Sequence, residues 1–289
     1  MKIPFVKMQG IGNDFIVISP LLDKNINKIL QPNIVKYMAN RHYGIGADQI
    51  LFIDSYAGKE ADYEYRILNA DGTEVEQCGN GARCVTKFLK SRGFLQFDNV
   101  KLKCQAGILE SRLLPDESIE VKMTPPKFGI KHVGFNMKKK IDISLQSQNI
   151  FSIPWKNSQI IFSPVSMGNP HAVININYLH QEKLERIFDY INESDFFMQG
   201  INVGFCISKN INSLNLRVFE RGVGETLACG SGACAAVVSG ISSGNLKPNF
   251  PVDVKLRGGV LKIRWSGNIN DSVFMSGPAE EVFEGKIFL

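Results

Sequence analysis

Two segments of this chain carry nearly the same glycine-rich phrase, about half the chain apart. Glu74–Arg83 reads EVEQCGNGAR, and Glu225–Cys234 reads ETLACGSGAC. The longer segments Arg66–Val85 and Arg217–Ala236 align without a gap, with Arg, Glu, Cys, two Gly and Ala identical in register. A chain that repeats one such unit must fold it twice, so the repeat constrains the fold more than any other feature.

A second pairing lies upstream of the first. GNDFIVI begins at Gly12 and GNPHAVI begins at Gly168, so the order of the two motifs is the same in both halves. Two pairings in the same order indicate two similar halves. Two copies are too few for a solenoid, and two facing domains are the natural arrangement.

The pattern around each cysteine predicts the same local structure. Tyr63–Leu68 and Leu214–Phe219 alternate as strands do, and a turn, the cysteine and a helical pattern follow each of them. The helices should stop near Gly93 and Gly244. Further helices are expected at Ile34–His42 and Gln181–Ile191, and further strands at Asp14–Ser19, Ile50–Ile53, Lys101–Gln105, Ile108–Leu113, Ile119–Met123, Ile160–Pro164, Ala172–Ile176, Val203–Ile207, Val252–Leu256 and Val260–Trp265.

These elements predict the domain organisation. A chain of 289 residues is long enough for two domains. We expect an α/β fold of the α+β type: two pseudo-symmetric, strand-rich domains, each with a central helix, and an active site in the cleft between them. The N-terminal half should span 1–124, completed by a strand at 276–289, and the C-terminal half 125–275. The stretch 125–157 is polar and shows no clear period.

Composition and targeting signals narrow the class of protein. The chain is 44% hydrophobic with a net charge of +5, which is typical of a globular protein. Neither a secretory signal nor an apolar run near 18 residues is present, so we expect no membrane partner and a cytoplasmic protein with reduced thiols. Lysine and arginine are not clustered with aromatics, which argues against the alternative of a basic RNA-binding module and any nucleic-acid partner.

The cysteines and histidines give no metal-binding pattern. The six cysteines contain no Cys-x-x-Cys pair, and the four histidines do not cluster in ligand spacing. We therefore expect no metal site. A redox or metal-binding protein that uses the cysteines is the second non-enzymatic alternative, and it predicts bound metal or a stable disulfide.

Each Cys-Gly-x-Gly phrase places a thiol where a helix should start. Backbone N–H groups at a helix N-terminus stabilise negative charge, so the pKa values of Cys78 and Cys229 should be lowered. The glycines leave room for a carboxylate on the same N–H groups. Two such thiols suit the inversion of a carbon next to a carboxylate, because a proton must leave one face and another must arrive on the other. The remaining cysteines lack this setting and are interpreted as small core residues: Cys84, Cys104, Cys206 and Cys234.

Along its whole length the sequence resembles the diaminopimelate epimerase family. The matching motifs are GIGNDF at Gly10–Phe15, RHYGIGADQ at Arg41–Gln49, NADGTEVEQCGNGARC at Asn69–Cys84, SMGNPH at Ser166–His171, INVGF at Ile201–Phe205 and ERGVGETLACGSGACAA at Glu220–Ala236. The resemblance implies an isomerase without a cofactor that interconverts LL- and meso-diaminopimelate, a small-molecule substrate, in lysine and peptidoglycan precursor synthesis.

The resemblance also implies roles for individual residues. It makes Cys78 and Cys229 the two acid/base thiols, and places His171 and Glu220 near the reacting centre. The substrate-binding residues that it implies are Asn13, Gln49, Asn69, Gly79, Asn80, Asn169, Asn202, Glu220, Arg221, Gly230 and Ser231. It implies a homodimer as well, with Phe274 at the contact.

One alternative keeps the fold and changes the substrate. A proline-type racemase, or another isomerase of a small acid, would use the same two thiols. The set of asparagines with Arg221 argues against it, because these side chains suit a second charged end on the substrate.

Overall fold

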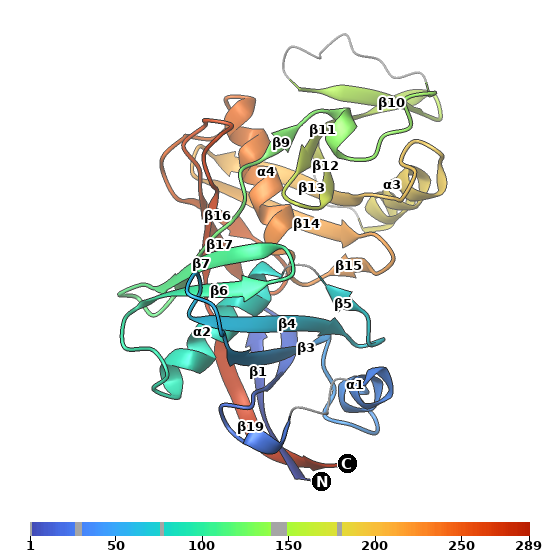
Figure 1. Ribbon diagram of the computed structural model, residues 1–289. Helices are drawn as coiled ribbons and strands as arrows, with labels where there is room; N and C mark the ends of the chain where they lie inside the picture. Colours follow the sequence, from blue (N-terminus) through green and yellow to red (C-terminus); the bar gives the residue numbers. More distant parts are fainter. Residues whose placement is uncertain (1, 27–30, 76–77, 140–148, 178–180) are drawn as a thin grey trace. The chain divides into compact units, whose positions relative to one another are not determined.

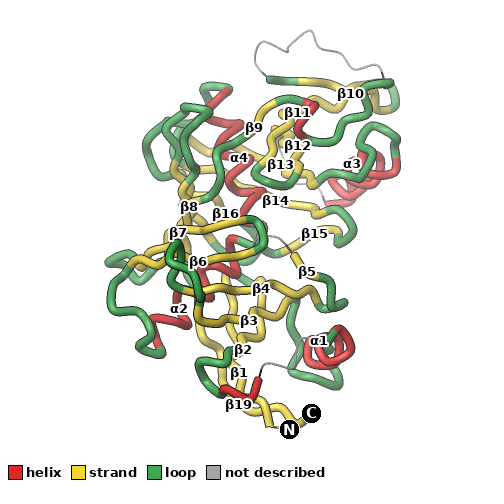
Figure 2. The backbone as a smooth tube through the Cα atoms, viewed as in Figure 1, coloured by secondary structure: helices red, strands yellow, loops and turns green. Residues whose placement is uncertain are grey.

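A computed structural model describes residues 2–26, 31–75, 78–139, 149–177 and 181–289 (Figures 1 and 2). The chain divides into two compact units, which we describe separately. The first unit comprises Met1–Lys122 and Ser276–Leu289, and the second comprises Met123–Met275. None of the helices in the described ranges has both the length and the apolar character that crossing a lipid bilayer requires.

The first unit is built on one mixed sheet. Its strands run in the order β19-β1-β2-β3-β4-β6-β7-β8, with parallel pairs at β2–β3 and β4–β6 and antiparallel pairs elsewhere. The bounds are β1 (Lys2–Gly10), β2 (Asn13–Ile18), β3 (Gln49–Ser55), β4 (Tyr63–Asn69), β6 (Asn99–Cys104), β7 (Gly107–Leu113), β8 (Ile119–Lys122) and β19 (Glu280–Phe288), and the short β5 (Glu74–Val75) pairs with β4.

Helix α2 (Gly79–Ser91) is the central helix of this unit. It packs against β1 and β2 at one side of the strand order and against β7 and β8 at the other, so the sheet curves around it. Its apolar side chains Val85, Phe88 and Leu89 are fully buried. Gly93 follows the helix with φ of 74°, a left-handed conformation that glycine adopts without a steric cost. The smaller helices are α1 (Pro32–Ala39) and the 3₁₀ turn η1 (Lys24–Ile26).

The second unit repeats this arrangement. Its strands run β10-β11-β12-β13-β14-β16-β17, with parallel pairs at β12–β13 and β14–β16. The bounds are β10 (Phe151–Trp155), β11 (Ser158–Ser166), β12 (Pro170–Asn175), β13 (Asn202–Asn210), β14 (Ser213–Glu220), β16 (Val252–Lys255) and β17 (Val260–Arg264), with β9 (Lys127–Phe128) beside β11 and β15 (Gly224–Thr226) beside β14. β18 (Phe274–Gly277) spans the point where the chain returns to the first unit.

Helix α4 (Gly230–Ser242) occupies the position of α2 and packs against β11, β12, β13 and β17. It is followed by Gly244 with φ of 76°, the counterpart of Gly93. The second helix of this unit is α3 (Gln181–Glu193), and η2 (Ile130–His132) is a 3₁₀ turn. The predicted pair of strand-rich halves with central helices is therefore confirmed.

Several elements differ from the sequence-based expectations. α1 begins at Pro32, because proline suits the first turn of a helix, and it ends at Ala39 instead of His42. The stretch 125–157 contains β9, η2 and β10, so its lack of a clear period was misleading; residues 140–148 lie outside the described residues. β1 was not predicted, whereas the C-terminal strand expected at 276–289 is present as β19 and is mostly exposed.

The shared Arg and Glu of the repeat form the same brace in both units. Arg66 on β4 binds both carboxylate oxygens of Glu74, at 2.9 and 2.7 Å. Arg217 on β14 binds Glu225 at 2.6 Å, and Arg257 binds the other oxygen of Glu225 at 2.7 Å. The braces differ in exposure: the Glu74 side chain is 33% exposed, whereas that of Glu225 is 7% exposed.

This difference predicts unequal stability losses. Glu225→Gln leaves two guanidinium groups around a buried site, and it should cost about 3 kcal/mol of unfolding free energy, as expected when a buried pair loses one partner. Glu74→Gln, the matched control in the other unit, should cost less than about 1 kcal/mol. Urea denaturation of the two variants measures both losses. Equal losses would show that burial does not set the strength of the brace.

Candidate active site

Cys78 caps the N-terminus of α2. Its backbone is extended, with φ of −142° and ψ of 112°, and its Sγ accepts a hydrogen bond from the Gly81 N–H at 3.4 Å. A Cβ at Gly81 would lie 3.1 Å from the Leu51 side chain, so glycine leaves room for β3 to pack against this turn of the helix. The sulfur is thus held at the positive end of the helix.

Asn13 and Asn80 lie next to this sulfur. The β1–β2 hairpin turns through Ile11 and Gly12, both with positive φ, and Gly10 pairs with Asn13 across the turn. Asn13 Oδ1 lies 3.9 Å from Cys78 Sγ and 3.3 Å from Asn80 Nδ2. One predicted substrate-binding side chain, Asn13, therefore contacts the predicted catalytic thiol, and a second, Asn80, contacts Asn13.

Cys229 is the N-cap residue of α4 and has a similar extended backbone, with φ of −129° and ψ of 107°, but its side chain makes no capping hydrogen bond. A Cβ at Gly232 would lie 3.3 Å from Cys229 Sγ and 3.1 Å from the Val218 side chain, so glycine leaves room for the sulfur here. The polar contacts of the thiol differ from those of Cys78. The Cys229 thiol lies 3.2 Å from Glu220 Oε2 and 3.6 Å from Ser231 Oγ, and Glu220 is held by Thr226 Oγ1 at 2.7 Å.

The expected lowering of the thiol pKa is wrong for Cys229. Burial raises the pKa of this thiol well above its ordinary value, and the negative charge of Glu220 raises it further. The pKa-lowering contacts, from the Ser231 side chain and the Gly232 backbone, are smaller. Sequence reasoning considered the helix N-terminus and omitted desolvation, which opposes it. Cys229 is therefore a protonated thiol at neutral pH, and it donates to Glu220.

His171 lies beside the same helix start. Its Nε2 contacts Asn169 Oδ1 at 3.0 Å and Ser231 Oγ at 3.1 Å. Its Nδ1 is buried and has no hydrogen-bond partner within the described part of the chain. Burial lowers the pKa of His171 to about 3, so the ring is neutral. We assign the proton to Nε2, because a buried N–H without an acceptor is costlier than a bare lone pair.

The two half-sites use equivalent strand positions. In the first unit Gln49 pairs with Phe15 and with Asn69 across β2, β3 and β4, and Gln49 Nε2 donates to Asn69 Oδ1 at 2.9 Å. In the second unit Asn202 on β13 pairs with His171 on β12. Glu220 occupies the position in the repeat that Asn69 occupies in the first half. The halves therefore differ chemically where His171 replaces Phe15 and Glu220 replaces Asn69.

Arg221 is an exposed side chain at the edge of the second half-site. Its backbone N–H donates to Asn202 Oδ1 at 3.0 Å, and its Nη1 donates to the Gln199 carbonyl at 3.2 Å. A cavity of about 780 Å³ lies beside it within this unit, and its lining includes Asn192, Gly200 and Gly222. Arg221 is the only one of the predicted site residues in the described lining.

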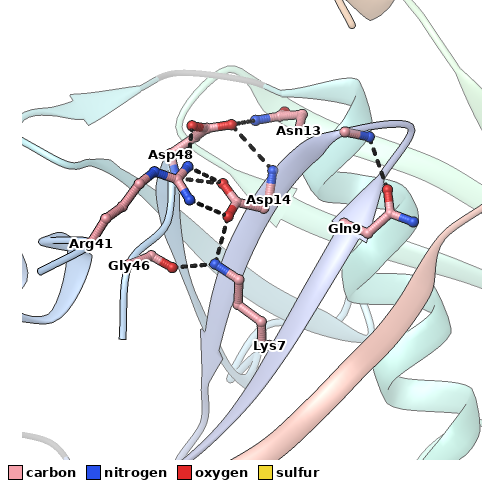
Figure 3. Close-up of polar contacts among 8 residues, drawn as sticks. Lys7, Gln9, Asn13, Asp14, Arg41, Gly46 and Asp48 are labelled. Atoms are coloured by element: carbon pink, nitrogen blue, oxygen red, sulfur yellow. Dashed lines mark hydrogen bonds and ion pairs between the residues drawn. The ribbon is translucent and has the colours of Figure 1, made fainter. Parts of the chain in front are cut away.

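A charged cluster behind Asn13 was not predicted. It consists of Lys7, Asp14, Arg41 and Asp48, and Figure 3 shows its contacts. Asp14 and Arg41 belong to the motifs GIGNDF and RHYGIGADQ. They were not predicted, because only the residues expected to contact substrate were selected from these motifs. Among the described residues, no group of three His, Cys, Asp or Glu side chains is arranged to hold a metal ion. The other cysteines are buried, as expected for core residues: Cys84, Cys104, Cys206 and Cys234.

Comparison with solved structures matches the fold of the whole chain. A PhzF-family phenazine biosynthesis protein from Bacillus anthracis aligns with a TM-score of 0.71, 15% identity and 100% of both chains covered. A hydroxyproline epimerase from Agrobacterium vitis aligns with a TM-score of 0.69 and 14% identity, over 99% of this chain and 92% of that one. At these identities the likeness concerns the fold alone.

Comparison of sequences is more specific. The family model for diaminopimelate epimerase matches residues 5–129 and 163–282. The diaminopimelate epimerase of Nitrosospira multiformis is 42% identical over 289 residues, covering 100% of this chain and 99% of its own length. That of Acidovorax ebreus is 40% identical over 292 residues, covering 99% of this chain and 98% of its own length. Since the relatives match nearly end to end and the family model covers most of the chain, the protein belongs to the diaminopimelate epimerase family, a family of isomerases.

Proposed function

We propose that this protein interconverts LL- and meso-diaminopimelate, and that Cys78 and Cys229 act on one substrate carbon as base and acid. The observation that carries the proposal is the matched pair of N-cap cysteines with unlike surroundings. Cys229 is a protonated thiol hydrogen-bonded to Glu220, and Cys78 lies at the N-terminus of α2 beside amide groups. An inversion needs one group that takes a proton and one that gives a proton.

The proposed chemistry runs as follows. The thiolate of Cys78 takes the proton from the α-carbon, and the C–H electron pair remains on the substrate as a carbanion. Cys229 then gives its thiol proton to the opposite face, so a new C–H bond forms and Cys229 becomes a thiolate. Backbone N–H groups at the starts of α2 and α4 stabilise the charge on the substrate carboxylate, at Gly79, Asn80, Gly230 and Ser231.

The reverse direction requires Cys229 to lose its proton first. Glu220 Oε2, at 3.2 Å from the sulfur, is the acceptor in contact with it. We therefore propose that Glu220 holds the Cys229 proton during this step. The first half-site has an amide, Asn69, at the equivalent position. The two thiols would therefore differ in their neighbouring groups as well as in the face of the substrate carbon that each one contacts.

The proposed role of His171 is to position other groups, not to transfer protons. A buried neutral ring with a pKa of about 3 does not exchange a proton near pH 7. Its Nε2 instead holds Ser231 and Asn169. Ser231 Oγ in turn lies 3.6 Å from Cys229 Sγ.

The distal end of the substrate is assigned to Arg221, Asn69, Asn169 and Asn202. Diaminopimelate carries a second ammonium and carboxylate, and a guanidinium binds a carboxylate with two parallel hydrogen bonds. A proline-type racemase remains the second candidate, because hydroxyproline epimerase has the same fold. Its substrate lacks a second amino-acid end, so it would not need Arg221. We further propose that the enzyme needs no cofactor and works in the cytoplasm as a homodimer. Activity that survives dialysis against EDTA would support the first proposal, and gel filtration tests the homodimer.

The first prediction concerns the two thiols. Cys78→Ser and Cys229→Ser should each reduce epimerisation by at least about 10³-fold, because each step then lacks its acid or base. In D₂O the wild-type product should carry deuterium at the inverted carbon. Cys104→Ala, a change at a buried cysteine outside the site, should keep turnover and lower only stability. Near-normal turnover by Cys229→Ser would overturn the two-thiol assignment.

The second prediction concerns specificity. Arg221→Leu keeps most of the side chain's bulk and removes its charge, so kcat/KM for diaminopimelate should fall about 10²-fold or more. Arg186→Leu, which removes an exposed arginine on α3, is the matched control and should change kcat/KM little. Turnover of proline by the native enzyme at a rate like that of diaminopimelate would favour the second candidate.

The third prediction uses the pKa of His171. The folded protein keeps this ring neutral down to about pH 3, whereas the unfolded chain protonates it near pH 6.5. The unfolded state therefore binds the extra proton between these values, so the contribution of His171 to stability is lost as the pH falls through this window. His171→Gln should reduce the slope of unfolding free energy against pH by about 1.4 kcal/mol per unit between pH 4 and 6. His132→Gln, at an exposed histidine, should change the slope much less.

A further inference from the structure

The side-chain amide of Asn13 is hydrogen-bonded to the carboxylate of Asp48. Its Nδ2 donates to Asp48 Oδ2 at 3.0 Å, and the other oxygen of Asp48 accepts from Arg41 Nη2 at 2.8 Å (Figure 3). An ionised carboxylate accepts hydrogen bonds and cannot donate them. It must therefore face the amide nitrogen of Asn13 and not the amide oxygen. The Asn13 oxygen therefore points to the other side, toward Cys78 Sγ at 3.9 Å.

The chain of hydrogen bonds continues into α2. Asn80 Nδ2 donates to Asn13 Oδ1 at 3.3 Å, and Asn80 Oδ1 accepts from Arg83 Nη1 at 2.9 Å. Arg83 is fully buried, and its Nε also donates to the Pro278 carbonyl at 3.1 Å. A guanidinium can only donate, so it must face the oxygen of Asn80.

The two ends of this chain fix its direction. Every bond runs from donor to acceptor in one sense, from Arg83 through Asn80 and Asn13 to Asp48. Neither end group can exchange its role, so neither amide can rotate by 180° without placing like groups together. An asparagine in water has no such preference, and the direction comes entirely from the charged ends.

The carboxylate end is itself braced by a second set of charges. Asp14 binds Lys7 at 2.6 Å and Arg41 at 2.9 and 2.7 Å. The backbone N–H groups of Asp14 and Asp48 each donate to the other's carboxylate, at 3.2 and 2.9 Å. Burial opposes ionisation of Asp14, but the bonds from Arg41 and Lys7 outweigh it and hold its pKa well below the usual range. Asp14 therefore stays ionised, and its contacts with Arg41 and with the Asp48 backbone N–H hold this cluster in place.

The equivalent residue in the second half is held in the opposite sense. Asn169 offers its Oδ1 to His171 Nε2, whereas Asn13 offers its Nδ2 to Asp48. The orientation of Asn13 is thus set by its own neighbours, Asp48 on one side and Asn80 with Arg83 on the other, and it is not a general consequence of the repeated fold.

We propose that Asp48 is a positioning residue that holds the carbonyl oxygen of Asn13 toward Cys78 and the substrate. In this orientation Asn13 accepts a hydrogen bond from the Cys78 thiol or from a substrate ammonium. In the reversed orientation its amide N–H would face the sulfur and stabilise the thiolate. The catalytic consequence rests on the proposed function, whereas the orientation itself does not.

The experiment replaces Asp48 with asparagine, which has nearly the same shape and can donate or accept. The first readout needs no substrate: the rate of Cys78 alkylation by iodoacetamide against pH, followed by peptide mass spectrometry. Asp48→Asn should move the midpoint of this profile to lower pH, because the released Asn13 amide can turn its N–H groups to the thiolate. Asp54→Asn, at a half-buried aspartate on β3, the strand that Asp48 immediately precedes, is the matched control and should leave the midpoint in place.

A double-mutant cycle separates orientation from charge. Removing the negative charge of Asp48 also favours the thiolate, but that effect persists in an Asn13→Ala background. If Asp48 acts through Asn13, the shift should be clearly larger with Asn13 present than with alanine there. Equal shifts in both backgrounds would overturn the proposal. Asp48→Ser serves as the second variant if Asp48→Asn does not fold, as judged by its melting transition.

The second readout is epimerisation. Asp48→Asn should lower kcat/KM about tenfold, and the double variant should lose no more than Asn13→Ala alone. Multiplicative losses would mean that Asp48 does not act through Asn13. If the wild-type protein fails to epimerise diaminopimelate, the proposed function fails, and the alkylation profiles still decide the orientation of Asn13.

Discussion

Each half of this protein is built around a central helix whose N-cap residue is a cysteine. The sheet curves around α2 in one unit and α4 in the other, so the start of each helix is fixed by apolar packing along its whole length. In the second unit Gly232 leaves room for the sulfur of Cys229, because a Cβ there would lie 3.3 Å from it. The strands β2, β3 and β4, and their counterparts β12, β13 and β14, carry the polar side chains to the same end. The start of a helix is also where backbone N–H groups have no carbonyl partner within the helix, so such a place suits the binding of an anion.

The duplication supplies two similar half-sites, and a few substitutions make them different. Cys229 is buried against the Glu220 carboxylate, which keeps its proton on the sulfur. The first half has neutral amides around Cys78. A two-base inversion needs one deprotonated and one protonated group at the moment of reaction. If the two sites were identical, neither thiol would be favoured as the protonated one. The position that Glu220 occupies beside Cys229 belongs in the first half to the amide Asn69, so the surroundings of the two thiols differ in charge.

The repeat made much of the fold predictable from the sequence, because a motif that occurs twice marks the same strand, turn and helix in both places. The helices that follow Cys78 and Cys229 begin and end where capping cysteine and terminal glycine predict. The strands β1 and β10 were missed, since partly charged or short strands lack a clean alternation. Their pairing is decided by neighbours that lie far away in the sequence, such as the β1–β19 ladder between the two ends of the chain.

The site shows the same division between local and non-local information. The identity of the polar residues could be taken from motifs, but neither their protonation nor their orientation could. The pKa of Cys229 depends on burial, which no local pattern measures, and it opposes the effect of the helix start. The direction of the Asn13 amide depends on Asp48, 35 residues away in the chain, and on Arg83 from α2. A hydrogen-bond chain that ends in a guanidinium and a carboxylate has one direction, and that direction determines which atom of an asparagine reaches the sulfur.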